Sequence, residues 1–113
     1  MATTITAHPA PFMSLNAVTA AGPGAVSNLG GSLAQHSLSA TVSNFAGTGN
    51  WTISLEASLD NVNFFVLASQ ALNANAAIHF SGVVSFPARY VRANLQTDPG
   101  TTSITVTAWV ASA

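Results

Sequence analysis

Charge is nearly absent from this chain, and both cysteine and lysine are missing altogether. Charged residues make up 4% of the sequence, against about 25% in an ordinary soluble domain. The absence of cysteine excludes disulfide scaffolds, thiolate metal sites and cysteine nucleophiles. The only basic residues, Arg89 and Arg92, are too few to form a phosphate-binding stripe, so we expect no nucleic-acid partner.

Long apolar runs are missing as well. No stretch approaches the roughly 18 residues that a membrane-spanning helix needs, so we expect no membrane partner. No basic region precedes Arg89 to open a signal peptide, so we expect synthesis in the cytoplasm without one. Disorder does not explain the scarcity of charge, because disordered chains have low hydrophobicity and this chain is 49% hydrophobic. A folded chain with a net charge of -1 favours association, so we interpret it as a protein that packs against other protein.

Apolar and polar residues alternate along most of the chain. The clearest stretch is WTISLEASL (51–59), whose odd-numbered residues are mostly apolar and whose even-numbered residues are polar, which predicts a strand with one buried face. The same period of two recurs in AQHSLSATVSN (34–44) and TTSITVTAWVA (101–111). No segment has a sustained helical period, so we expect essentially no helix. About eight short strands with regular turn signals predict an all-β fold, a single antiparallel β-sandwich of the jelly-roll type over residues 15–113.

Glycine and asparagine mark the predicted turns. The segments AGPG (21–24) and DNV (60–62) have turn-forming residues between apolar runs, and we interpret the pair Gly30 and Gly31 as a further turn.

Residues 1–14 form a separate segment. Pro9 and Pro11 disfavour a helix there and favour an extended N-terminal arm. One interpretation is a frayed terminus. The other is an arm that contacts a neighbouring subunit through Ile5, Phe12 and Met13, whose apolar side chains are unfavourable in water.

Catalytic and metal sites are not indicated by the residues present. Glu56 and Asp60 could be imagined as a glycosidase carboxylate pair, but nothing nearby in the sequence supplies a raised pKa or an aromatic sugar platform. His8, His36 and His79 lack metal-ligand spacing. We therefore expect a protein that is not an enzyme, with no catalytic residue, no cofactor and no metal.

The two arginines raise the question of ion pairing. Because they are three residues apart on a predicted strand, they point to opposite faces. We hypothesise that Arg92 pairs with Glu56 across strands and that Arg89 meets an acid near a loop, either Asp60 or Asp98. The alternative is that all of these are ordinary surface charges.

Two stretches together resemble a known family. LEASLDNVNFFVL (55–67) resembles the S-x-DG-x-x-W hairpin of discoidin-like (galactose-binding-like) jelly rolls, and PARYVRANL (87–95) resembles their ARYVR strand. Asn61 replaces the hairpin glycine and Phe64 replaces the tryptophan. Asn tolerates the left-handed conformation, and Phe64 keeps an aromatic plug. The loops are rich in Ala, Gly, Ser and Asn, whereas discoidin-like glycan binders use Arg, His, Asp and aromatic residues.

More narrowly, the chain resembles small virion proteins of tailed bacteriophages, which include capsid decoration (cement) proteins. This resemblance implies a virion structural protein on the outer capsid surface, with the major capsid protein and copies of itself, in a homotrimer, as partners. The alternative is a carbohydrate-binding module of a phage tail or baseplate. That function needs an exposed aromatic residue, and Trp109, which has the opposite parity from its apolar neighbours, is the candidate. Trp109 could equally be a subunit contact or part of a core.

Overall fold

The computed structural model describes residues 11–47, 50–79, 84–97 and 101–113. Within these ranges the chain is all β, and it has no helix that could cross a membrane. Eight strands follow one another along the chain: β1 (Phe12–Val18), β2 (Gly22–Pro23), β3 (Ser27–Gly47), β4 (Trp51–Ser58), β5 (Phe64–Leu72), β6 (Ala76–His79), β7 (Val84–Thr97) and β8 (Thr101–Ser112).

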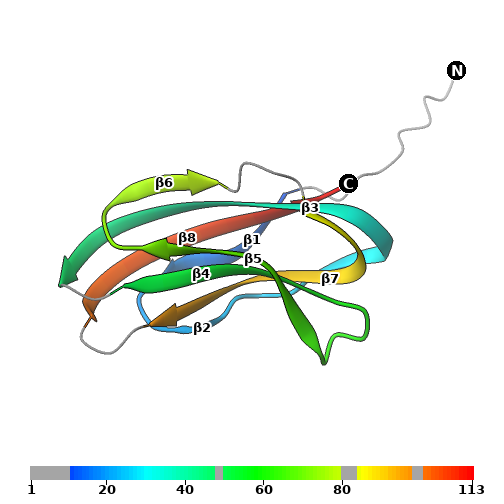
Figure 1. Ribbon diagram of the computed structural model, residues 1–113, viewed down its shortest axis with the longest axis horizontal. Coiled ribbons are helices and arrows are strands. Elements are labelled where there is room, and N and C mark those ends of the chain that lie inside the picture. The colour runs from blue at the N-terminus through cyan, green and yellow to red at the C-terminus, as the bar shows by residue number, and fades with distance from the viewer. Residues whose placement is uncertain (1–10, 48–49, 80–83, 98–100) are drawn as a thin grey trace, which may run out of the picture.

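The strands form one antiparallel sheet with the order β1-β8-β3-β7-β4-β5, to which β2 adds on β7 and β6 adds on β3. Two long strands fold this sheet over. The first half of β3 pairs with the first half of β7, while its second half pairs with β8 and β6. The second half of β7 pairs instead with β4 and β2. Figure 1 shows β3 and β7 running along the molecule and connecting the two halves of the sheet.

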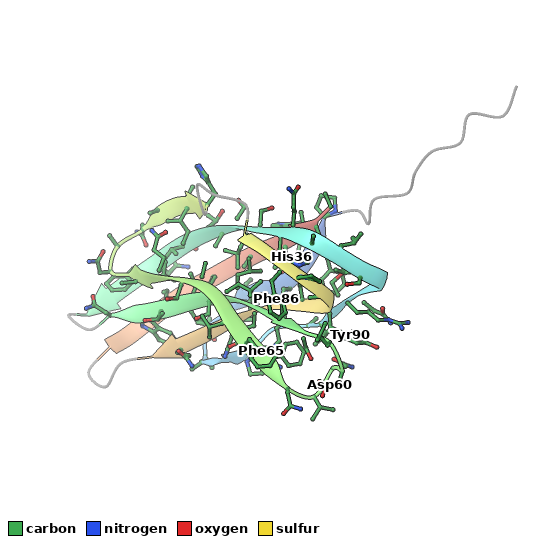
Figure 2. The ribbon with its side chains drawn as sticks, turned by 45° about the vertical axis from the view of Figure 1, so that its right-hand side comes forward. His36, Asp60, Phe65, Phe86 and Tyr90 are labelled. Atoms are coloured by element: carbon green, nitrogen blue, oxygen red, sulfur yellow. The ribbon has the colours of Figure 1, made fainter. Side chains whose placement is uncertain are left out.

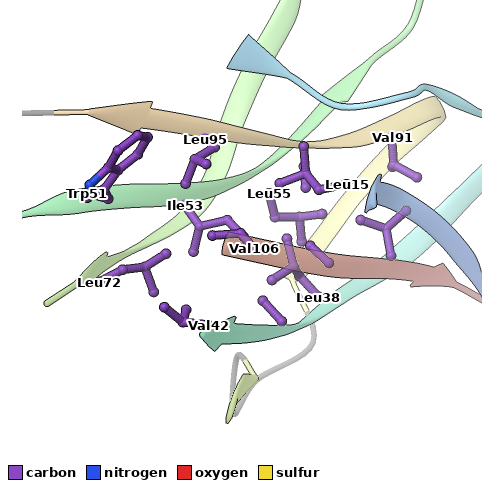
Figure 3. Packing of buried hydrophobic residues seen from close by; sticks show 14 of the residues in the cluster. Leu15, Leu38, Val42, Trp51, Ile53, Leu55, Leu72, Val91, Leu95 and Val106 are labelled. Carbon is purple, nitrogen blue, oxygen red and sulfur yellow. The ribbon is translucent and has the colours of Figure 1, made fainter. Parts of the chain in front are cut away.

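The predicted all-β antiparallel class is confirmed, and the arrangement in two layers is consistent with the predicted sandwich. We call them the β8 layer (β1, β8, the second half of β3, and β6) and the β4 layer (β5, β4, the second half of β7, and β2). A single buried apolar cluster has members in both layers, as Figure 3 shows for Leu38, Val42 and Val106 opposite Ile53 and Leu95.

The alternation in the sequence predicted which residues face this core. In β3 from His36 onward the buried residues are His36, Leu38, Ala40 and Val42, while Ser39, Thr41 and Ser43 are exposed. In β8 the even-numbered residues from Ile104 to Val110 are buried, and in β7 the odd-numbered residues Val91, Ala93 and Leu95 are buried.

The structure corrects two predictions about strands β3 and β4. The pair Gly30 and Gly31 does not end a strand, because β3 continues through it as a bend with a register shift against β7 and with Gly30 at a φ of 77°. The second concerns β4, which was predicted to have one buried face. Its polar residues Ser54, Glu56 and Ser58 are also buried, because β4 lies between two other strands whose side chains cover its outer face.

The first strand begins earlier in the chain than predicted. Strand β1 begins at Phe12, inside the segment predicted to be an arm, and pairs with β8. Ile5 and the first ten residues lie outside the described residues. Phe12 is half-buried and packs against the core, so the apolar side chain that we expected to contact a neighbour is used within the fold.

Candidate functional site

The outer face of the β8 layer has many hydroxyl groups around Trp109, and the exposed His79 of β6 lies opposite Ser39 on the same face. Trp109 lies on this face, opposite Met13 of β1 and Ser39 of β3, and 41% of its surface is exposed. Thr107 pairs with Thr41 next to it, so hydroxyl groups continue along both strands. Trp109 is therefore outward, which leaves it available as a contact residue and excludes it from the core. We call this surface the Trp109 face.

Charge is divided unequally between the two layers. None of the five charged residues of the sequence falls within β1, β3, β6 or β8. Three of them, Glu56, Asp60 and Arg92, belong to the β4 layer or its hairpin, and Arg89 lies in the first half of β7. Asp98 lies outside the described residues. The strands of the Trp109 face therefore contribute no Asp, Glu, Lys or Arg side chain that would have to be desolvated when the face is covered, and their exposed imidazole is that of His79.

Glu56 and Arg92 form an ion pair on the outer face of the β4 layer. They lie directly opposite each other in the β4–β7 ladder, and Arg92 Nε donates to Glu56 Oε1 at 2.7 Å. Asn94 Nδ2 donates to the second carboxylate oxygen at 3.0 Å. The Arg92 guanidinium also stacks 3.8 Å above the ring centre of Phe64. The side chain of Glu56 is only 7% exposed, so this pair is a structural element of the sheet rather than a loose surface contact.

Arg89 does not pair with Asp60, which was one of the two acidic partners that we considered for it. Its Nε donates to Asn28 Oδ1 at 3.4 Å, and its guanidinium lies 5.7 Å from the ring centre of Tyr90. The other acid, Asp98, is outside the described residues. Arg89 is exposed, which is the ordinary condition of a surface arginine.

Asp60 is used to build the turn of the β4–β5 hairpin. Its carboxylate accepts the backbone N–H of Asn63 at 2.8 Å and of Val62 at 2.9 Å, and it also accepts the side chains of Asn63 and Ser58. These donors, led by the Asn63 N–H, hold the pKa of Asp60 well below its usual range. Asn61 adopts the left-handed conformation at a φ of 61°, which asparagine tolerates. The turn is consequently well fixed although it is exposed.

This fixed turn presents apolar side chains to solvent, a feature that the sequence prediction missed. The exposed residues are Leu59, Val62, Phe65 and Val66, with Val62 at 78%. Leu59 was predicted to face the core, but β4 ends at Ser58 and the hairpin extends past the end of the sandwich. Phe65 lies 6.0 Å from Phe86 in a tilted ring contact, as Figure 2 shows beside Asp60. An apolar residue inside a turn, Val62, was the signal available in the sequence.

His36 and Ser112 form a buried polar contact at the other end of β8. His36 Nδ1 lies 2.7 Å from Ser112 Oγ, and His36 Nε2 lies 2.8 Å from the carbonyl oxygen of Phe86. A carbonyl oxygen only accepts, so Nε2 donates to it. Both side chains are almost inaccessible, and the adjoining pocket of about 140 Å³ is small for a ligand. The contact ties β3, β7 and β8 together. In the described ranges no three His, Cys, Asp or Glu residues gather as a metal site.

Comparison with known proteins adds information on the fold. No protein-family model matches the chain, and no curated protein matches it. The crystal structure of PirA is similar over 96% of this chain and 96% of that one, with a TM-score of 0.50 and 12% sequence identity. At this identity the similarity concerns the arrangement of strands alone.

Proposed function

We propose that this protein is a non-enzymatic structural subunit of a phage virion, a capsid decoration protein that binds the outside of the head and stabilises contacts between capsomers. The observation that carries the proposal is the uneven distribution of charge, with an uncharged Trp109 face on one layer. The resemblance of the sequence to small virion proteins supplies the identity of the partner, the major capsid protein.

The physical argument rests on desolvation. Burying a charged side chain at an interface costs free energy that its new partner must offset, whereas hydroxyl groups can exchange water for other neutral donors and acceptors. Burial of apolar surface stabilises the contact by about 25 cal/mol for each Å² removed from water. A decoration protein repeats its contact over many copies, so modest contacts of this kind suffice to reinforce a shell.

Cosedimentation with capsids tests the proposal. The purified full-length chain is mixed with heads from the phage that encodes it, and bound protein is quantified after pelleting. We expect saturable binding that the substitution Trp109→Lys weakens strongly. Val66→Lys, which adds the same charge on the other layer, serves as the matched control and should bind. Absence of binding by the unaltered chain would contradict the proposal.

A carbohydrate-binding module of a tail or baseplate is the second candidate, and the exposure of Trp109 favours it. Aromatic rings that are half-exposed among hydroxyl groups are suited to stacking against sugar rings, because they offer an apolar face with polar neighbours. Removal of residues 1–10 separates the two functions. It should reduce capsid binding if the arm contacts the shell, and it should leave polysaccharide binding unchanged.

A further inference from the structure

Strand β5 is an exposed edge that lacks most of the usual protection. It ends the strand order of the sheet, and in the described part of the chain its ladder partner is β4. Edge strands are normally kept from pairing with other chains by charged residues, proline or short length. β5 is nine residues long and contains no charged residue and no proline. Its one protective feature is a register shift that leaves Leu67 without a ladder partner.

The hairpin beside this edge adds an exposed apolar surface. We call Leu59, Val62, Phe65 and Val66 the hairpin surface. Phe65 and Val66 lie on opposite faces of β5, because their ladder partners are the core-facing Ala57 and the outward-facing Glu56, so the hairpin surface flanks the edge on both faces. The hydrogen bonds of Asp60 and Ser58 fix the turn that presents Leu59 and Val62. Because that conformation is already set, little conformational entropy is lost when the surface is covered.

We infer that the occupant of this edge is a second copy of the same chain, with the β5 strands of two copies paired antiparallel across a two-fold axis. In a two-fold interface the same surface meets itself, so any charge on it would lie close to its own copy. The absence of charge from Phe64 to Leu72 removes that repulsion. Antiparallel pairing also brings the hairpin surface of each copy toward the uncharged Leu72 end of its partner's strand.

The edge is long enough for such a pairing. A nine-residue strand is about 30 Å long, and apolar side chains of the hairpin surface flank it on both faces. The Trp109 face belongs to the other layer and stays uncovered. The dimer differs from the homotrimer that the resemblance implies. It does not involve the capsid contact of the proposed function, so either one can fail without the other.

Sedimentation equilibrium of the full-length chain over a wide concentration range tests the inference. We expect a mass twice the 11.4 kDa of one chain. Val66→Lys and, separately, Gln70→Lys place like charges across the axis and should weaken dimerisation by about tenfold or more. Thr41→Lys adds the same charge at an exposed position of the β8 layer and should leave the dimer intact.

Hydrogen exchange gives an independent readout, because β5 amides that face away from β4 should become protected as the concentration rises. A monomer at all concentrations, a trimer, or a dimer that survives both β5 lysines would overturn the inference. If Val66→Lys proves unfolded by circular dichroism, Gln70→Lys decides, since its exposed side chain has no packing to lose.

Discussion

Replacing Arg92 should destabilise the protein much more than replacing Arg89, although both are arginines on the same strand. Arg92→Ala leaves the 7%-exposed carboxylate of Glu56 with the side-chain amide of Asn94 as a hydrogen-bond donor and removes its cationic partner. Losing a hydrogen bond to a charged group costs about 1.5–3 kcal/mol, and losing the guanidinium stacking on Phe64 costs about 1 kcal/mol. We therefore expect Arg92→Ala to lower the free energy of unfolding by about 3 kcal/mol, within the range for partly buried pairs.

Chemical denaturation with linear extrapolation measures this effect, at fixed protein concentration because association would add to the apparent stability. Arg89→Ala is the matched control. Its side chain is exposed and its contact with Asn28 is long, so we expect a change within about 0.5 kcal/mol.

A double-mutant cycle isolates the pair itself. Glu56→Gln and Arg92→Gln, alone and together, should give a coupling free energy of about 1–2 kcal/mol, because each single substitution already removes the charge interaction. Losses that add within about 0.5 kcal/mol would refute the reasoning, since they would mean that the two side chains act independently.

Three further outcomes are expected. Asp60→Asn should reduce the loss of stability that the protein shows as the pH falls below about 4. The pKa of Asp60 is lowered in the folded protein, so its carboxylate stabilises the fold above its ordinary pKa of 3.8, and this contribution disappears as the pH falls. An unchanged acid-unfolding profile would count against this. His36→Leu should cost about 1–3 kcal/mol in urea unfolding, because a buried backbone carbonyl loses its donor, and no loss would show that the contact is dispensable. Gly24→Ala should lower the melting temperature, because a Cβ there would overlap the backbone and side chain of Ser14, whereas Gly31→Ala meets nothing and should be nearly neutral.

The orientation of side chains within strands was predictable from the sequence. In a strand, successive side chains point to opposite faces, so the apolar parity of β3, β7 and β8 identified the residues that became the core. The hypothesis that Glu56 lies opposite Arg92 followed from the same parity together with the few charges available.

The burial of both faces of β4 was not predictable in this way. Whether Ser54 and Glu56 are covered depends on which strands lie beside β4, and its neighbour β7 comes from a distant part of the sequence. The same holds for Arg89, whose partner Asn28 is 61 residues away. Side chains reach such neighbours only after the sheet has formed, so local patterns contain little information on them.

The sequence by itself determined the secondary structure, the core-facing residues and the scarcity of charge, because each of these is a property of residue type and of a local period of two. Only the tertiary structure decided that all described charges lie outside the β8 layer, that β5 is an edge, and that Leu59 extends past the sandwich instead of entering it. Those features arise from the folding of one sheet into two layers through β3 and β7. That folding is settled by packing between strands far apart in the chain, and it determines which surfaces remain open for binding.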